Sequence, residues 1–408
     1  MISDLPIWSA EPVDLNWYRA VADNQLPAKY ILARRIAIPA DFASYDTDQL
    51  WQLHQDASDQ LIQLQSDIRT TQVNIASLEK QTTSLLDLNV ELVNRMLTSC
   101  NFCQWRCEVD RSDESAKPGA CQLGEETRVG SYFHHRGEEL LYRGRMGSGT
   151  IFFTSCNMRC QFCQNGNISQ DKYNGKRTTA KELAAMIWLL RIEGCHNINF
   201  VGGDPTIHLH TIINAIAQLG ERPSLDTLRE IEKVKSDRFI QYRRDDKYGN
   251  YHGEFNVPLL WNANFFMSTE TMRILRTVID IWLPDFKFGT DKKCAIRLSR
   301  TPWYWDTITR NLQLIHDWGE DFTIRHLIMP NHINCCSRPI IEWIATHLPG
   351  IQVNLMDQYH PDSFTNPQTN KYNERYADIA RQITSEEFSE VLYLAEQYHL
   401  NYETITFS

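Results

Sequence analysis

Residues 149–163 read GTIFFTSCNMRCQFC. The first part of this segment is typical of a buried strand, and three cysteines follow it in a C-x3-C-x2-C spacing. A closed structural zinc site takes four protein ligands. A four-iron four-sulfur cluster held by Cys156, Cys160 and Cys163 would instead leave one iron open to a small molecule. The segment therefore predicts a metal centre with an open position at the end of a strand.

The alternative for these three cysteines is a zinc site that borrows a fourth ligand. The thirty residues after Cys163 contain neither His nor Cys, so the local sequence does not supply that ligand. Phe162 stands directly before the last cysteine, where an aromatic ring could shield the edge of a cluster from water. These observations favour the iron-sulfur interpretation over zinc.

Strand-like and helical segments alternate on the carboxyl side of this motif. The predicted strands are 150–154, 198–201, 259–262, 281–286, 322–329 and 353–356. The predicted helices are 179–193, 208–219, 269–277, 304–318, 338–347 and 385–398. Six strand-helix units with right-handed crossovers predict an α/β fold, a full or partial (β/α)6 TIM-like barrel. Functional residues are then expected at the carboxyl ends of the strands.

Residue composition and spacing divide the chain into three parts. Residues 1–98 lack glycine and carry apolar residues at helical spacing, which predicts a helical N-terminal region. Residues 99–145 form a cysteine-rich lead-in, and residues 146–408 form the barrel. A long, charge-dense stretch at 221–255 interrupts the barrel, and we expect a solvated insertion with one helix there.

Length and charge limit the classes of function. The 408 residues exceed one usual domain, and the net charge of −10 disfavours binding of nucleic acid phosphates. The N-terminus is acidic without an apolar core, and no stretch of 18 apolar residues occurs. We therefore expect a cytoplasmic protein that does not bind membranes.

Eleven cysteines in such a chain are expected to be metal ligands rather than disulfides. Seven of them fall between Cys100 and Cys163. The other four are scattered, and we expect them to be buried hydrophobic residues or inert thiols. These four are Cys195, Cys294, Cys335 and Cys336.

A second motif follows the second predicted strand. The segment 200–206 reads FVGGDPT, and two glycines after a strand let the backbone approach a ligand closely. A glycine pair alone is weak evidence, but here it follows a three-cysteine loop by one strand-helix unit. The cofactor-binding candidates of this segment are Gly202, Gly203, Asp204 and Pro205.

With these two motifs the chain resembles radical S-adenosylmethionine (radical SAM) enzymes, and within them the branch related to pyruvate formate-lyase activating enzyme. The matching segments, which span about residues 100–400, are RMGSGTIFFTSCNMRCQFCQNGNISQ, FVGGDPTIHL, WNANFF, DIWLPDFKF, IRHLIMPNH and NLMDQYHP. The first 95 residues have no counterpart in the resemblance.

The resemblance implies that Cys156, Cys160 and Cys163 ligate a [4Fe-4S] cluster whose open iron binds the amino and carboxylate groups of SAM. An electron from a donor such as flavodoxin or ferredoxin would cleave SAM to a 5′-deoxyadenosyl radical, which abstracts hydrogen from a substrate. Gly202 to Pro205 match the Gly-Gly-Glu-Pro segment that holds the SAM amino group. Asp204 is one methylene shorter than that Glu, which leaves a direct hydrogen bond open to question.

Polar residues at later strand ends are expected to line the same cavity. Asn262 and Asn264 share one parity and are candidates for cofactor binding. Asp285 and Lys287 share a parity too, either as catalytic residues or as a structural ion pair. Arg325 and His326 are adjacent, so only one of them can face the lumen, and His326 is our third catalytic candidate.

The lead-in carries a second group of cysteines. Cys100, Cys103 and Cys107 lie close together, and Cys121 follows. Four thiolates with this spacing could close a zinc site or hold an auxiliary iron-sulfur cluster. We prefer a structural site that ties the helical region to the barrel over an electron relay.

Three functions remain in competition. The first is a radical SAM enzyme that acts on a protein or peptide, with the N-terminal region as a docking surface. The second is a radical SAM enzyme for a small metabolite or RNA, in which that region only packs or dimerises. The third is a non-catalytic zinc-binding interaction protein, which would not cleave SAM.

Overall fold

A computed structural model describes residues 15–404 apart from 71–72 and 74, and within this part all six predicted strands are present. They are β2 (Ser148–Phe153), β4 (Ile198–Gly202), β7 (Leu259–Ala263), β8 (Ile281–Pro284), β9 (Ile324–Leu327) and β10 (Val353–Met356). Most of their residues are buried, which suits parallel strands covered on both faces.

The six strands lie side by side in chain order. β2, β4, β7 and β8 pair in parallel within one sheet, and β9 and β10 pair in parallel within another. Parallel bridges from Trp282 to Phe322 and from Asp285 to Arg325 join the two sheets. The predicted partial barrel is therefore confirmed.

Additional strands extend both edges of the barrel and were not predicted. β1 (Arg128–His135) pairs antiparallel with β2 and with β3 (Lys176–Arg177), while β11 (Tyr402–Glu403) pairs in parallel with β10. β1 mixes buried and half-exposed positions and is rich in polar residues, so it lacks the continuous apolar run that marks the parallel strands.

Helices cover the outer face of the barrel, and the six predicted ones are all present. They are α7 (Ala180–Ile192), α8 (Leu209–Ala217), α10 (Thr269–Arg276), α12 (Tyr304–Asp317), α13 (Arg338–His347) and α14 (Ser385–Gln397). Capping boxes begin α7 at Thr179 and α14 at Thr384. An unpredicted helix, α11 (Lys292–Ser299), precedes α12.

The insertion at 221–255 holds α9 (Leu225–Lys233) and a hairpin of β5 (Asn250–Tyr251) and β6 (Glu254–Phe255). One of its charges is not solvated, because Lys235 is buried and its Nζ lies 2.5 Å from a carboxylate oxygen of Glu193 at the end of α7. This buried pair fastens the insertion to the barrel.

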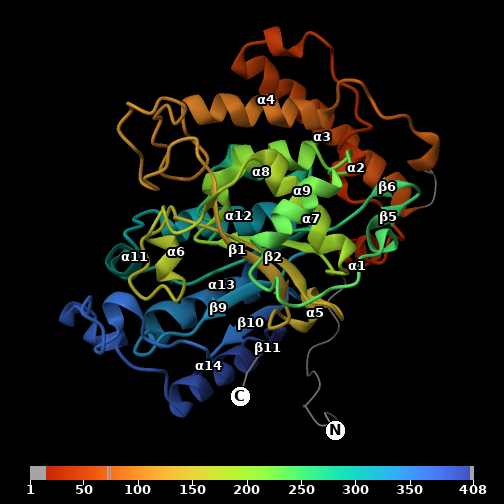
Figure 1. Ribbon diagram of the computed structural model, residues 1–408. Coiled ribbons are helices and arrows are strands. Elements are labelled where there is room, and N and C mark those ends of the chain that lie inside the picture. The colour runs from red at the N-terminus through yellow and green to blue at the C-terminus, as the bar shows by residue number, and fades with distance from the viewer. Residues whose placement is uncertain (1–14, 71–72, 74, 405–408) are drawn as a thin grey trace.

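The described N-terminal residues form α1 (Asn16–Ala22), α2 (Lys29–Ala33), α3 (Thr47–Arg69) and α4 (Leu85–Thr98). α4 packs against α8 on the outside of the barrel (Figure 1). α1 lies elsewhere, since Trp17 donates to Asp280 and the Tyr18 amide donates to Asp321, two residues that precede β8 and β9. α1 therefore closes the amino end of the barrel, opposite the strand ends that were expected to carry function.

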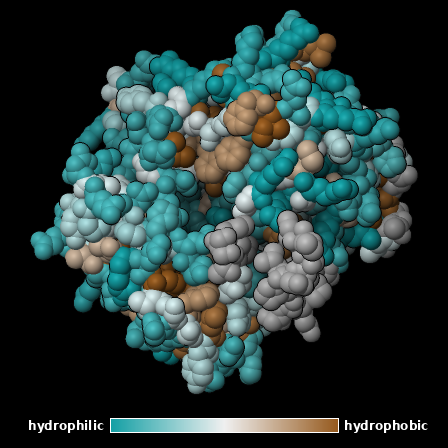
Figure 2. All heavy atoms as spheres, turned by 60° about the horizontal axis from the view of Figure 1, so that its bottom comes forward, coloured by the Kyte–Doolittle hydropathy of each residue, from teal (hydrophilic) through white to brown (hydrophobic). Residues whose placement is uncertain are grey.

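Apolar side chains of the N-terminal helices and the barrel form one continuous core, which includes Leu61, Leu92, Phe200 and Trp261. On the face shown in Figure 2, hydrophobic residues occur in small groups separated by hydrophilic ones. Within the described residues, no helix combines the length and apolar character that a bilayer span requires.

Candidate metal and cofactor site

A cavity of about 230 Å³ lies at the carboxyl ends of the parallel strands. It gathers ten of the predicted site residues from separate strand ends. These are Cys156, Cys160, Cys163, Gly202, Gly203, Asp204, Asn262, Asn264, Asp285 and Lys287. Arg325, Phe162 and Met356 complete much of the remaining wall. Of the predicted barrel residues, Pro205 and His326 do not line the cavity.

The three cysteines occupy the loop after β2, and the sulfur atoms of two of them, Cys156 and Cys163, receive hydrogen bonds. The Met158 amide donates to Cys156 Sγ at 3.3 Å, and Ser169 Oγ donates to Cys163 Sγ at 3.1 Å. Burial raises the pKa of Cys160 to about 12, with the positive charge of Lys287 opposing it. Buried thiols whose sulfur atoms accept hydrogen bonds are suited to lose their proton when they bind a metal cation, because the hydrogen bonds stabilise the thiolate.

Gly202 and Gly203 serve packing between strand ends. Gly202 adopts a φ of +126°, and a Cβ atom on Gly203 would lie 1.5 Å from the carbonyl oxygen of Ser155. Both glycines thus let the end of β4 press against the cysteine loop. Their Cβ positions are filled by the chain itself, and both residues line the cavity, so their role in cofactor binding stays a prediction.

Asp204 is buried and uses both carboxylate oxygens to hold the backbone. It accepts hydrogen bonds from the Thr206 amide at 2.9 Å and the Asn264 amide at 3.0 Å. Burial raises its pKa, although these hydrogen bonds oppose the shift. Pro205 begins the short helix η3 (Pro205–His208), which Asp204 caps. Asp204 therefore fixes the position of Asn264, whose side-chain amide donates to Asn157 at 2.7 Å and lies 3.5 Å from Cys156 Sγ.

A group of opposite charges forms the opposite wall of the cavity. Lys287 Nζ lies 2.6 Å from one carboxylate oxygen of Asp285, and Arg325 Nε lies 3.1 Å from the other. Burial alone would raise the pKa of Asp285, but the two cations hold it below its ordinary range. Arg325 also donates to the side-chain oxygen of Asn262. The predicted pair Asp285 and Lys287 is thus an ion pair that faces the cavity.

His326 is the one catalytic candidate that faces away from the cavity. Its Nδ1 lies 2.7 Å from the carbonyl oxygen of Phe286, and its Nε2 lies 2.9 Å from Ser337 Oγ. Burial lowers its pKa to about 4, so the ring is neutral at pH 7. Strand alternation turns Arg325 into the lumen instead, and Arg325 replaces His326 among the candidate site residues.

Two buried carboxyls below Arg325 were missed in the sequence. Glu138 accepts a hydrogen bond from Asn199 on β4 at 2.6 Å, and Glu139 accepts one from Asn354 on β10 at 3.1 Å. Burial alone would raise the pKa of both carboxyls. Hydrogen bonds and the charge of Arg325 nevertheless lower the pKa of Glu138, whereas the neighbouring Glu138 raises the pKa of Glu139 further. Through Asn199 and Asn354 the pair connects β4 with β10.

Comparison with known proteins decides the family. Residues 150–344 match the sequence profile of the radical SAM superfamily. An uncharacterized protein of Methanocaldococcus jannaschii is 35% identical over 398 residues, which cover 95% of this chain and 98% of that protein. The chain belongs to the radical SAM superfamily. It is accordingly an enzyme by family.

Solved structures that resemble this radical SAM protein do so distantly. Streptococcus suis SuiB bound to the precursor peptide SuiA is 14% identical, with a TM-score of 0.39 over 62% of this chain and 47% of that one. A domain of pyruvate-formate lyase-activating enzyme from Bacteroides vulgatus is 13% identical, with a TM-score of 0.28 over 37% and 82%. The chain spans about half the length of the SuiB chain.

The cysteine loop of this radical SAM protein fits an iron-sulfur cluster. Superfamily membership implies a [4Fe-4S] cluster and SAM. The three thiols line one cavity, two of their sulfurs already receive hydrogen bonds, and the buried ring of Phe162 packs beside them. Hydrogen bonds to sulfur and shielding from water are the means by which a protein holds and tunes such a cluster.

The lead-in cysteines also meet, around a small enclosed cavity. Cys100, Cys103, Cys107 and Cys121 all line it. Burial raises the pKa of Cys103, and the neighbouring thiols add to the shift.

Hydrogen bonds tie the lead-in to the cysteine loop on either side of Cys156. Ser155 Oγ donates to the carbonyl oxygen of Cys121 at 2.6 Å, and Trp105 Nε1 donates to that of Asn157 at 2.7 Å. The two groups of cysteines are therefore mechanically connected.

Proposed function

We propose that this protein cleaves SAM reductively and uses the resulting 5′-deoxyadenosyl radical to abstract hydrogen from a protein or peptide. The observation that carries the proposal is the single cavity in which Cys156, Cys160 and Cys163 face a wall of fixed charges and amides. When bound to these cysteines, the [4Fe-4S] cluster supplies the electron that breaks the sulfonium bond of SAM.

The residues of the cavity bind and orient the reactants. Asn264 is held by Asp204 and presents its amide beside Cys156, where it can meet the polar groups of SAM. Lys287 and Arg325 offer positive charge to a carboxylate, either of SAM or of the substrate. Asp285 holds both cations in place, so a bound carboxylate meets them already oriented.

The cavity opens to solvent at the strand ends. Gln164 and Asn165, which line it, are exposed. A side chain or loop of a larger molecule can therefore reach the cavity without being engulfed as a whole.

The N-terminal helices are not all available as a docking surface for that substrate. α1 closes the amino end of the barrel, opposite the cavity, and its contacts to Asp280 and Asp321 serve packing. A protein substrate would instead approach the strand ends, where the cavity lies.

Anaerobic reconstitution with iron and sulfide tests the reaction. The reconstituted protein, reduced with dithionite or with flavodoxin or ferredoxin and its reductase, should convert SAM to 5′-deoxyadenosine and methionine. Cys160→Ala should abolish the conversion, while Cys195→Ala, which removes a buried thiol outside the cavity, should keep it. A colourless protein with bound zinc and no turnover would favour the zinc-binding interaction protein.

The substrate class is tested by comparing proteins and metabolites of cells with and without the gene. A mass change on a peptide that depends on Cys160 supports the proposal. Changes confined to a small metabolite or to RNA would favour the alternative substrates.

We further propose that the lead-in cysteines hold a structural metal site rather than an electron relay. In support, the lead-in is bonded to both neighbours of Cys156. Cys107→Ala should lower the melting temperature or the metal content and leave SAM cleavage per bound cluster near the wild-type value. Loss of SAM cleavage in a folded Cys107→Ala protein that still carries its full [4Fe-4S] cluster at Cys156, Cys160 and Cys163 would indicate a relay.

A further inference from the structure

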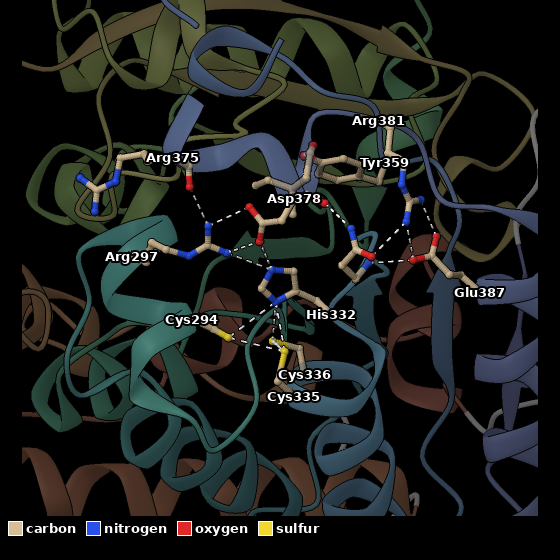
Figure 3. A network of polar contacts seen from close by, with 12 residues as sticks. Cys294, Arg297, His332, Cys335, Cys336, Tyr359, Arg375, Asp378, Arg381 and Glu387 are labelled. Carbon is tan, nitrogen blue, oxygen red and sulfur yellow. Dashed lines mark hydrogen bonds and ion pairs between the residues drawn. The ribbon is translucent and has the colours of Figure 1, made fainter. Parts of the chain in front are cut away.

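Three of the scattered cysteines meet a histidine beside the barrel. Cys294 lies in α11, His332 follows β9, and Cys335 and Cys336 lie in a π-helical turn, η5 (Ile333–Ser337). One ligand atom from each residue lies within 4.8 Å of all the others. Figure 3 shows the three sulfur atoms gathered at one edge of the His332 ring. The expectation that these cysteines are unrelated thiols is therefore revised, and only Cys195 remains apart.

The distances match the edges of a zinc tetrahedron. With Zn–S near 2.3 Å and Zn–N near 2.0–2.1 Å, tetrahedral angles place sulfurs about 3.8 Å apart and sulfur and nitrogen about 3.6 Å apart. Cys335 Sγ lies 3.6 Å from Cys294 Sγ and 3.8 Å from Cys336 Sγ. His332 Nδ1 lies 3.6, 3.2 and 3.7 Å from the sulfurs of Cys294, Cys335 and Cys336.

Hydrogen bonds among the four side chains cannot account for this arrangement. A neutral imidazole has one nitrogen that accepts, with a single lone pair, and it can take one thiol proton. Three sulfurs nevertheless converge on Nδ1 of His332. A cation at the centre would use that lone pair and one from each sulfur, so that all four groups are satisfied together.

The far side of the histidine carries the partner that metal-bound imidazoles use. His332 Nε2 lies 3.3 Å from a carboxylate oxygen of Asp378, in the short helix η7 (Glu374–Ile379). Arg297 holds that carboxylate with both guanidinium nitrogens (Figure 3). Arg297 also lies 3.2 Å from Nε2, but a guanidinium only donates. With a metal on Nδ1 the ring proton is on Nε2, and Asp378 is the group there that can accept it.

We propose that Cys294, His332, Cys335 and Cys336 form a closed Cys3His zinc site. Four protein ligands leave no position for substrate, so the role of the site is structural. It ties α11 and η5 together and, through Asp378, fastens the C-terminal segment that follows β10. The proposal is independent of the reaction proposed above.

The zinc site would also steady the cysteine loop of the cavity. The Arg159 amide donates to the carbonyl oxygen of Ser299 at 3.0 Å, and the Gln161 amide donates to that of Leu298 at 2.8 Å. Both acceptors lie at the end of α11, the helix that carries Cys294. The two residues that flank Cys160 are thus anchored on an element that the zinc would hold.

Metal analysis of the full-length protein tests the site. Wild type, Cys335→Ser and Cys195→Ser are purified in parallel, and zinc and iron per chain are measured by mass spectrometry. Cys335 is half-buried, so its substitution disturbs the fold least among the three cysteines. We expect Cys335→Ser to contain about one zinc ion fewer per chain than the other two, with unchanged iron. Equal zinc in all three proteins would overturn the proposal.

A second variant keeps all four ligands, so it tests the site even if Cys335→Ser does not fold. Asp378→Asn leaves the cysteines and the histidine in place but weakens the acceptor for Nε2, which should lower zinc affinity roughly 10–100-fold in competition with a chelator. Removal of zinc by the chelator should also speed hydrogen exchange at the amides of Arg159 and Gln161, which are anchored on α11. Unchanged zinc affinity in a folded Asp378→Asn protein would overturn the assignment.

Discussion

Gly203→Ala should destabilise the protein and deplete its iron, because the new methyl group meets fixed backbone. The Cβ atom would lie 1.5 Å from the carbonyl oxygen of Ser155, whereas ordinary contacts begin near 3.4 Å. The end of β4 and the cysteine loop must then separate by about 2 Å. Overpacking costs about 1–3 kcal/mol where side chains can yield, and a backbone neighbour places this variant at the upper end of that range.

The effect can be read as a melting temperature. Taking an unfolding entropy of about 2.1 cal/mol/K per residue, 408 residues give roughly 0.9 kcal/mol/K, so 3 kcal/mol lowers the midpoint by about 3–4 °C. Differential scanning fluorimetry and iron analysis check it. Gly166→Ala is the control, since a Cβ there has no neighbour closer than 3.7 Å. A Gly203→Ala protein that melts and binds iron like wild type would refute the reasoning.

Two further predictions concern buried charge. Asp285→Asn removes the carboxylate that pairs with both Lys287 and Arg325, and Arg325 keeps Glu138 and Glu139 at 3.8 and 3.9 Å. The substitution should lower the free energy of unfolding by about 2 kcal/mol, a value discounted because the groups are partly exposed. It should also abolish SAM cleavage, which Asp285→Glu should largely restore. Burial lowers the pKa of His54 to about 3, so the unfolded chain takes up a proton below pH 6.5 that the folded protein excludes, and stability falls with falling pH. His54→Gln can still donate to Asn89 but does not titrate. Between pH 6 and 5 its free energy of unfolding should fall by about 1.4 kcal/mol per pH unit less than that of the wild type. Equal slopes of melting temperature against pH in the two proteins would contradict this prediction.

The sequence predicted the parallel barrel because its strands are buried on both faces and therefore appear as short apolar runs. It missed β1, whose alternating exposure gives no such run. It also predicted most of the main cavity, since parallel strands bring their carboxyl ends together whatever lies between them.

Other features depend on three-dimensional register. The pairing of β9 with β10 determines that the side chain of Arg325, and not that of His326, enters the lumen. The sequence shows only that the two residues are adjacent and so point to opposite faces. Cys294 lies 38 residues before His332, so only the fold of α11 against η5 reveals them as neighbours. The His332-x2-Cys335-Cys336 spacing was the one signal in the sequence that could have indicated this group.

Electron paramagnetic resonance of the reduced, reconstituted protein tests the central claim most directly. A cluster held by Cys156, Cys160 and Cys163 with one open iron should give a reduced [4Fe-4S] signal that changes when SAM is added. Cys195→Ala should behave like wild type, and Cys160→Ala should lose the signal that responds to SAM. A fully assembled cluster whose spectrum is unchanged by saturating SAM would contradict the assignment of this cavity as the SAM site.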